Sequence, residues 1–408
     1  MTESEQDVLV QRLGRYPADR YPVQHATTQF HLGSARLHAG QGAAALPALT
    51  LAGEMFARAG MGLEQAKAGV MLGVALRQVG RLDDATAAFV NAGAVFSTLG
   101  QPAEQAAAAY NLGLVRQDTG DVDGARVAWT QARDLFLEAG YPAQAGAAAR
   151  DHGGSLLAMG QVGPALVLLE QALALAERAG DEPGAGAAAN ALGLAQVAAG
   201  DPAAAVSALR RALGAFARSV RPADHAMVKA NLALAHEQAG EHPRARLAAR
   251  QALAVQGAAA PVRAQAQQLL RRIPGREHED LLSVLAEVDL EQRVAVLREE
   301  VLRAAELTAR QRCALVSGFL DGLLARPAAS HDLAQSLLHV VLELPPRTYG
   351  LLVAAVVDAC AGRPEEDSER LRAVIGSALA RFALPQWQRL AASLNTAAEL
   401  AGEPATWR

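Results

Sequence analysis

The last third of the chain contains both cysteines, Cys313 and Cys360, together with the histidines His331 and His339. A thiol beside an imidazole is the arrangement that activates a cysteine nucleophile. However, neither cysteine lies in the sequence pattern of a caspase-like catalytic cysteine, and the segment shows no alternation of strands and helices that could position one. We therefore interpret both as buried thiols in apolar helices and expect no enzymatic activity.

Two further groups of residues are candidates for binding a metal or a nucleotide. His236, Glu237, Glu241 and His242 carry metal-ligand side chains, but their setting at the end of a helix and in a turn provides no dense ligand pair. The glycine-rich segment 184–190 mimics part of a dinucleotide-binding loop, but no strand precedes it. We interpret the first group as surface residues and the second as part of a helix, so the sequence predicts no metal and no cofactor.

The elements that must position any site follow a repeat of 40 residues, present in six copies. Five positions of the repeat, which we call registers, hold the same kind of residue in successive copies. Two registers are occupied mainly by glycine, two by alanine, and one by a large apolar residue that is replaced by alanine in the last copy. They are Gly33, Gly73, Gly113, Gly153, Gly193 and Ala233; Gly40, Gly80, Gly120, Gly160, Gly200 and Gly240; Ala45, Ala85, Ala125, Ala165, Ala205 and Ala245; Ala52, Ala92, Ala132, Ala172, Ala212 and Ala252; and Leu49, Phe89, Trp129, Leu169, Leu209 and Ala249. Each unit is predicted to be a hairpin of two helices that must stack on its neighbours to bury its apolar face.

Each register has a physical reason. A glycine inside a helix costs about 1 kcal/mol relative to alanine, so the first glycine register indicates packing too close for a side chain. The second glycine register is where the first helix ends in a left-handed residue, and Asp121, Asp201 and Pro202 follow it as expected at a helix start. We predict twelve helices within residues 25–258, with Trp129 buried between neighbouring repeats.

This pattern resembles the tetratricopeptide repeat. The Leu-Gly step of that repeat is matched at Leu72-Gly73, Leu112-Gly113 and Leu192-Gly193. The length of 40 residues, in place of about 34, resembles the variant found in kinesin light chains, bacterial peptide-sensing regulators and the scaffolds of CHAT proteases. The resemblance implies an all-α fold, namely a right-handed superhelical solenoid of six helix-turn-helix repeats, which binds partners on a concave face lined by the first helix of each repeat.

The resemblance also implies which residues line that groove. Family members place an asparagine beside the leucine, where its amide can bond an extended peptide backbone. Asn111 and Asn231 match this position, whereas the other repeats depart from it with His31, Met71, Asp151 and Ala191. His152 replaces the leucine itself, and we interpret it as a hydrogen-bonded packing histidine.

We expect Tyr110, Asn111 and Arg150 to lie in one concavity and to anchor an extended acidic peptide. A tyrosine supplies rigid apolar contact, an amide reads the backbone, and a guanidinium can clamp a carboxylate. The alternative, that these are solvated residues without a ligand, stays open. The predicted peptide-binding residues are Phe30, Arg77, Tyr110, Asn111, Gln117, Arg150, Asp151, Asn190 and Asn231.

Outside the repeats the 40-residue registers are absent, although helices still alternate with breaks at glycine and proline. From Thr308 to Gln311 the sequence has the pattern of a capping box that opens a helix. We expect about six helices after residue 275. The predicted parts are an N-terminal helix and linker (1–24), six repeats (25–258), a capping helix and break (259–275) and a C-terminal helical domain (276–408).

Charge and composition restrict the kinds of partner. The net charge is −4, so no basic excess is present to neutralise phosphates, and we expect no nucleic-acid partner. Only Lys67 and Lys229 are lysines, which leaves 38 − 2 = 36 arginines; this bias is typical of a GC-rich genome, and we expect a bacterial protein. The first residues lack a signal-type apolar core, and no window is apolar enough to span a membrane. We expect a cytoplasmic protein that does not contact membranes.

These features favour a non-catalytic interaction scaffold that binds a peptide segment of a partner protein in the groove of the repeats. The alternative hypothesis is a regulatory sensor, in which a peptide or small ligand in the groove changes its contact with the C-terminal domain. Self-association through the C-terminal domain is a further expectation. Because tetratricopeptide-like repeats serve many partners, the fold alone does not identify one.

Overall fold

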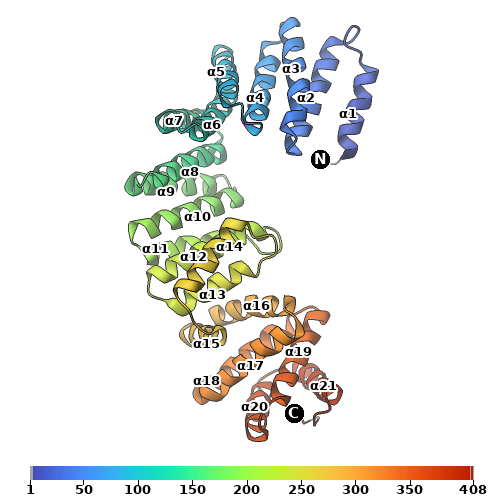
Figure 1. Ribbon diagram of the computed structural model, residues 1–408, viewed down its shortest axis with the longest axis vertical. Helices are drawn as coiled ribbons and strands as arrows, with labels where there is room; N and C mark the ends of the chain where they lie inside the picture. The colour runs from blue at the N-terminus through green and yellow to red at the C-terminus, as the bar shows by residue number, and fades with distance from the viewer. Residues whose placement is uncertain (1–2, 405, 408) are drawn as a thin grey trace. The chain divides into compact units, whose positions relative to one another are not determined.

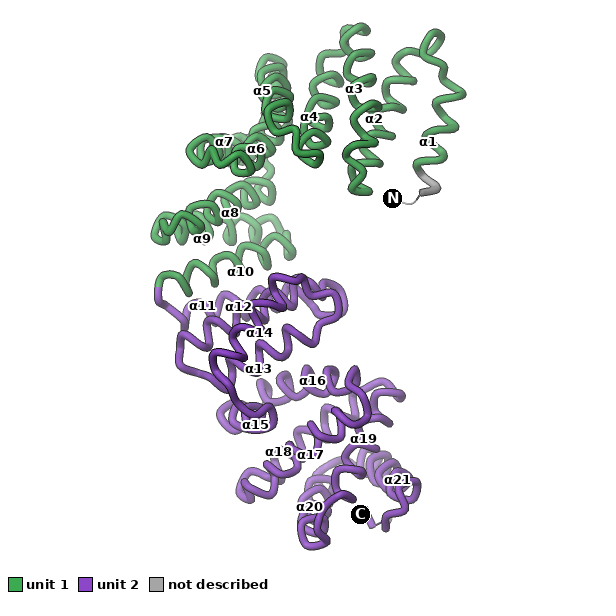
Figure 2. The backbone as a smooth tube through the Cα atoms, viewed as in Figure 1, with its two compact units in different colours: residues 1–199 green, residues 200–408 purple. Residues whose placement is uncertain are grey.

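The computed structural model describes residues 3–404 and 406–407, which form twenty-one α-helices and no strand (Figure 1). The chain divides into two compact units, residues 1–199 and residues 200–408 (Figure 2). Unit 1 contains α1 Glu3–Arg15, α2 Pro22–His38, α3 Gly42–Arg58, α4 Gly62–Gln78, α5 Leu82–Thr98, α6 Pro102–Asp118, α7 Val122–Glu138, α8 Pro142–Ala158, α9 Val162–Arg178 and α10 Glu182–Ala199. Unit 2 contains α11 Pro202–Ala215, α12 Pro222–Gln238, α13 His242–Leu253, α14 Ala260–Arg272, α15 Glu277–Glu287, α16 Leu290–Glu306, α17 Ala309–Ala325, α18 Pro327–Leu342, α19 Pro346–Ala361, α20 Glu365–Leu379 and α21 Leu384–Ala401.

The predicted helical hairpins are present. Residues 25–258 contain the twelve expected helices, α2 to α13, and a turn falls at every glycine of the second register. Within each unit, consecutive helices of this series pack against one another, as in a solenoid. The all-helical solenoid predicted from the repeat is therefore confirmed.

Glycines in the left-handed conformation end the helices. Gly120 has φ +79°, its N–H donates to the Gln117 carbonyl at 3.0 Å, and the Asp121 N–H donates to the Arg116 carbonyl at 2.8 Å. This is a Schellman cap, which satisfies carbonyls that a helix end otherwise leaves unpaired. The Asp121 side chain then accepts from the Gly124 N–H at 3.0 Å and caps α7. One turn thus ends a helix and starts the next, as the sequence predicted.

Glycines of the first register make room for the large apolar residue sixteen positions later. A Cβ atom on Gly73 would lie 2.8 Å from the ring of Phe89, and one on Gly113 would lie 2.5 Å from the indole of Trp129. Trp129 is fully buried, as predicted. Close packing of the two helices in these hairpins therefore explains why a residue costly to a helix recurs there.

Two corners of the chain share a geometry that differs from the glycine turns. Between α1 and α2, Nδ1 of His25 donates to the Tyr16 carbonyl at 2.8 Å. Between α11 and α12, Nδ1 of His225 donates to the Phe216 carbonyl at 2.9 Å. Both following helices begin with a proline. We call these segments, residues 16–21 and 216–221, the corner loops; they are five repeat lengths apart.

Unit 2 continues beyond the repeats with a helical core of its own. The predicted capping helix is α14, and seven helices follow it, so the expected count of about six was low by one. Leu282, Leu320, Leu333 and Leu371 belong to one buried cluster of this part. The capping box at Thr308 is present at the start of α17. How the chain divides into functional domains stays a prediction.

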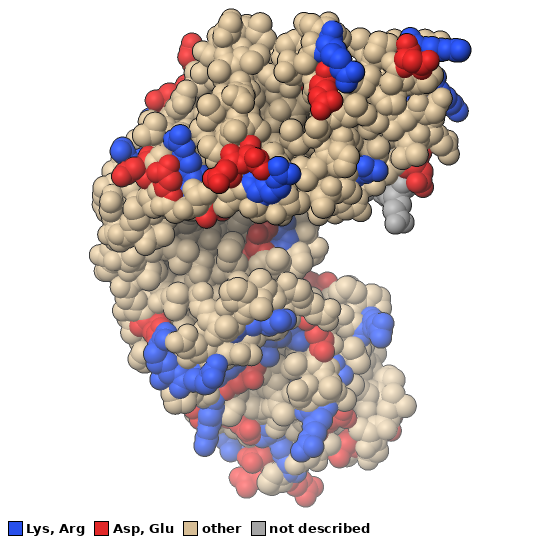
Figure 3. Space-filling view, turned by 45° about the horizontal axis from the view of Figure 1, so that its top comes forward, with Lys and Arg blue, Asp and Glu red and all other residues tan. Residues whose placement is uncertain are grey.

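The surface carries charges of both signs. On the face drawn in Figure 3, acidic and basic side chains lie beside one another, and no broad area has a single sign. Among the described residues, no helix combines the length and apolar character that crossing a bilayer requires.

Candidate functional site

Polar side chains join the first helices of successive repeats in unit 1. Nε of Arg77 on α4 donates to Asp118 Oδ2 on α6 at 2.5 Å. The Tyr110 hydroxyl on α6 donates to Asp151 Oδ2 on α8 at 2.6 Å. Each contact spans 41 residues, which is one repeat plus one residue. We call these two contacts the polar ladder.

Asp151 is the centre of the predicted peptide-binding cluster. Besides the Tyr110 hydroxyl, it accepts from Nε and an Nη of Arg150 at 2.9 and 2.8 Å. The side chains of Arg150 and Asp151 keep 29% and 20% of their surface exposed. Burial raises the pKa of Tyr110 well above its ordinary value of 10. The charge of Asp151 and the hydrogen bond from Tyr110 to Asp151 raise this pKa further, whereas the charges of Arg150 and Arg77 lower it. Tyr110 is therefore a neutral donor at physiological pH.

The predicted asparagines occupy three different settings. Nδ2 of Asn111 donates to the Ala107 carbonyl of its own helix at 2.8 Å, and the side chain is partly exposed. Asn190 is buried and has an interaction partner. Asn231 is buried in unit 2, where its Oδ1 accepts from Gln265 of α14 at 3.2 Å. Of the three, Asn111 is the one that a ligand on the first helices could reach without displacing buried contacts.

The remaining predicted residues of unit 1 lie apart from the Asp151 cluster. Phe30 is partly buried and packs against the apolar residues of α2 to α4, with its ring 5.6 Å from that of His31. Gln117 is exposed in the last turn of α6. The structure thus brings Tyr110, Arg150 and Asp151 together and connects Arg77 to α6 by its own ion pair.

A second polar group, which the sequence did not predict, lies in unit 2. Lys229 of α12 donates to Gln251 Oε1 at 2.8 Å and to Glu299 Oε2 at 2.5 Å, and Nε2 of His225 lies 3.3 Å from Glu299 Oε1. We call these four residues the Lys229 network. Burial by itself would raise the pKa of Glu299, but the charge of Lys229 and the hydrogen bonds from His225 and Lys229 outweigh it and lower that pKa to about 2.

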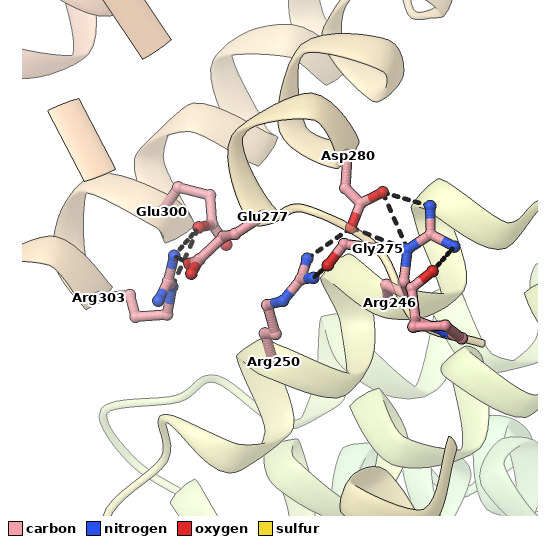
Figure 4. A network of polar contacts seen from close by, with 8 residues as sticks. Arg246, Arg250, Gly275, Glu277, Asp280, Glu300 and Arg303 are labelled. Carbon is pink, nitrogen blue, oxygen red and sulfur yellow. Dashed lines mark hydrogen bonds and ion pairs between the residues drawn. The ribbon is translucent and has the colours of Figure 1, made fainter. Parts of the chain in front are cut away.

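One ion-pair cluster connects the last repeat to α15, and a second joins α15 to α16 (Figure 4). Asp280 of α15 accepts from Nε of Arg246 at 2.9 Å and from Arg250 at 2.7 Å, both arginines belonging to α13. Arg303 donates to Glu300 at 2.7 Å and also contacts Glu277. Because the Asp280 side chain is only 2% exposed, its charge depends on both arginines for compensation.

Residues 144–218 match the family model described as tetratricopeptide repeat. This segment runs from α8 into the corner loop after α11, and the same registers extend on both sides of it from Gly33 to Ala252. Residues 144–218 therefore have the sequence of tetratricopeptide repeats. No curated protein matches the sequence.

Solved structures with a similar arrangement of helices include other repeat proteins. BtubC (BKLC) from P. vanneervenii has 16% identity and a TM-score of 0.45, with 59% of this chain and 92% of that chain covered. Kinesin light chain TPR-like repeats from Podospora anserina have 22% identity and a TM-score of 0.41, with coverages of 47% and 94%. The quorum sensor NprR from B. thuringiensis has 12% identity and a TM-score of 0.47, with coverages of 92% and 98%.

Tetratricopeptide repeats are in general a non-catalytic, protein-binding fold. Cys360 is buried as predicted, whereas Cys313 is only partly buried. Burial raises the pKa of the Cys360 thiol to about 11, although Arg363 and Arg372 oppose the shift. The thiol is therefore protonated at neutral pH, the opposite of an activated nucleophile. His339, one of the two histidines considered as partners for a cysteine nucleophile, stacks on Phe382 with ring centroids 6.5 Å apart.

The histidine that replaces a repeat leucine packs beside the buried tryptophan. The ring of His152 lies 6.4 Å from that of Trp129, and its Nε2 has no hydrogen-bond partner in the described structure. Burial lowers its pKa, and the charges of Arg126 and Arg133 lower it further. His152 is thus a packing residue, as predicted, but its Nε2 makes no hydrogen bond within the described residues.

The other chemical candidates have structural roles. The prediction that His236 lies on the surface was wrong: it is buried, and its Nδ1 lies 2.6 Å from Glu241. Glu237 pairs with Arg272. Within residues 3–404 and 406–407, no cluster of three or more potential ligands could hold a metal ion. The segment 184–190 is helical, and Asp181 accepts from the Gly184 N–H at its start.

One signal in the sequence could have identified the Lys229 network. The repeat position of Lys229 holds a small residue in four of the five preceding copies, namely Gly69, Ala109, Ala149 and Ala189, and Gln29 in the first. A buried lysine at a position that is small in most copies indicates a local requirement for charge. The partner Glu299 lies outside the repeats, so no register predicted it.

Proposed function

We propose that this protein is a non-catalytic scaffold that holds a peptide segment of a partner protein against the first helices of unit 1. The observation that carries the proposal is the Asp151 cluster, which fixes Tyr110 and Arg150 on adjacent repeats while leaving them partly exposed. Side chains already held in place lose little conformational entropy when a ligand binds.

The cluster keeps hydrogen-bonding capacity for a ligand. Arg150 uses two of the five N–H groups of a guanidinium on Asp151. The remaining donors can receive a carboxylate, and the Oδ1 of Asn111 can accept a backbone N–H, since Nδ2 is the atom bonded to Ala107. The partial exposure of Tyr110 leaves ring surface for apolar contact. An extended peptide with an acidic side chain fits these three functions.

The test uses the full chain and peptides selected on it from a random display library. We expect Asn111→Ala/Arg150→Ala to weaken binding of the selected peptides by about 30-fold or more, which corresponds to a hot-spot loss of about 2 kcal/mol. Helicity and thermal unfolding should stay unchanged, because both side chains are partly exposed.

A matched control is available on the second helices. Arg133 contacts the adjacent Asp134 on α7 in the same way as Arg150 contacts Asp151, and Asn91 is exposed on α5. Asn91→Ala/Arg133→Ala should bind the peptides like the wild type. Equal affinity of the two double variants would refute the proposed site.

A further inference from the structure

Unit 2 contains a pocket where the last repeat meets the helices that follow it. Its volume is about 480 Å³, within the range of roughly 300–1,000 Å³ that is typical of small-molecule sites. Its lining comes from α11, α12 and α13 on one side and from α15, α16 and the turn between them on the other.

The two sides of the pocket differ in chemistry. The cationic and titratable basic residues all belong to the repeats, whereas the later helices contribute mostly aliphatic side chains. The repeat side has Arg210, His225, Lys229, His236 and Arg244. The opposite side has Val284, Val288, Ala295 and Val296, with Gln292 and Glu299. A pocket divided in this way suits a ligand that has one anionic group and an apolar body.

The single carboxylate of the lining is already compensated. Glu299 is bonded to Lys229 and lies beside His225. Arg210, in contrast, has no ion pair or hydrogen bond with any residue that the structure describes, although it lines the pocket. The uncompensated charge of the lining is therefore positive.

Two more donors on the repeat side have unused capacity. Nε of Arg244 is buried and has no acceptor in the described part of the chain, while its terminal nitrogens lie 3.4 Å from Glu241 and 3.3 Å from Glu287. Lys229, whose side chain is 9% exposed, uses two of its three N–H groups. Buried donors without acceptors are costly, and an anionic ligand would satisfy them.

We propose that this pocket binds a small organic anion, with its carboxylate or phosphate group on the cations of α11 to α13 and its apolar body against the valines of α15 and α16. Such a ligand contacts the last repeat and the following helices at once, so its binding stabilises their junction. The site lies wholly in unit 2, and its existence does not depend on the peptide site of unit 1.

Calorimetric titration of the full chain with octanoate, monooctyl phosphate and octanamide tests the proposal. We expect saturable binding of at least one of the two anions, and binding of the neutral amide at least about tenfold weaker. The two anions distinguish a carboxylate from a phosphate head group. If neither anion binds, or if the amide binds as tightly as the anions, the proposal is wrong.

Two variants locate the site. Arg210→Gln should weaken binding of the anion at least about tenfold, whereas Arg211→Gln, at the next residue of α11 and outside the pocket, should leave it unchanged. Val288→Asn at the aliphatic side should also weaken binding. Bound anion should slow hydrogen exchange in α12 and α16. Equal affinity of the Arg210 and Arg211 variants, or protection confined to other helices, would overturn the assignment.

Discussion

A Cβ atom on residue 113 would lie 2.5 Å from the indole of Trp129, so the ring occupies the space that a side chain of Gly113 would need. The glycine is on α6 and the tryptophan on α7, the two helices of one hairpin. The last repeat has alanine at both equivalent positions, Ala233 and Ala249, and both are fully buried. Small and large residues are thus matched within these two hairpins.

We predict that the two positions are energetically coupled. Trp129→Ala should lower the free energy of unfolding by about 3–5 kcal/mol because it leaves a cavity. Gly113→Ala should lower it by about 1–3 kcal/mol because it overpacks the site. The double variant should lose less than the sum of both, since it recreates the alanine pair of the last repeat. Hydrogen exchange of α6 to α8 measures the loss locally, as expected for a solenoid.

Gly154→Ala is the control for this cycle. Gly154 lies within α8, and a Cβ there would meet no atom within 4 Å. The substitution should therefore stabilise the helix by up to about 1 kcal/mol. If Gly113→Ala behaved like Gly154→Ala, the close contact with Trp129 would not explain the glycine register.

We predict that Asp280 is essential for the junction between α13 and α15. Asp280→Ala should lower the free energy of unfolding by about 3–5 kcal/mol, because it leaves two arginines whose side chains are only 14% and 15% exposed without their anion. Asp84, which pairs with Arg81 where both side chains are more than half exposed, is the control. Asp84→Ala should cost less than about 1 kcal/mol. Similar losses for both aspartates in urea unfolding would contradict the prediction.

We predict an acid-dependent contribution of Glu299 to stability. Its pKa is lowered in the folded protein from 4.5 to about 2. A carboxylate of this kind stabilises the fold above its unfolded pKa, and the stabilisation is lost as the pH falls from 4.5 toward 2. The advantage of the wild type over Glu299→Gln should therefore be constant near neutral pH and shrink over that interval.

Urea unfolding at a series of pH values measures this difference. Glu343 is the control, since its pKa is also lowered, through its hydrogen bond from Arg298, but the carboxylate is exposed. Solvent screens that pair, so Glu343→Gln should produce a much smaller dependence on pH. A difference between wild type and Glu299→Gln that stayed constant down to pH 2 would show that Glu299 is not held ionised in the fold.

The helices and turns of the repeat region could be predicted because each register corresponds to one local backbone or packing requirement. Gly120 marks a left-handed helix end, and Gly113 marks close packing; both inferences rest on the recurrence of glycine at the same position of successive repeats. The contact of Tyr110 with Asp151 could also have been predicted from the repeat, because it spans one repeat plus one residue. We predicted that both side chains line the groove of the repeats, but we did not predict the hydrogen bond between them.

The polar contacts of unit 2 could not be predicted in this way. Lys229 meets Glu299 across 70 residues, and Arg246 meets Asp280 across 34 residues. In each case one partner lies in the last repeat and the other in helices that follow no period. Their packing depends on the tertiary structure of unit 2, which hydrophobic periodicity alone does not determine.

The two corner loops have a consequence for how the length of the chain can change. Residues 16–21 and 216–221 have different sequences but the same local geometry, and each is followed by a helix that begins with proline. The two corner loops are therefore equivalent connections between helices, separated by a whole number of repeats. A recombination event that connects residue 21 to residue 222 would remove five modules and create no type of junction that the chain does not already contain.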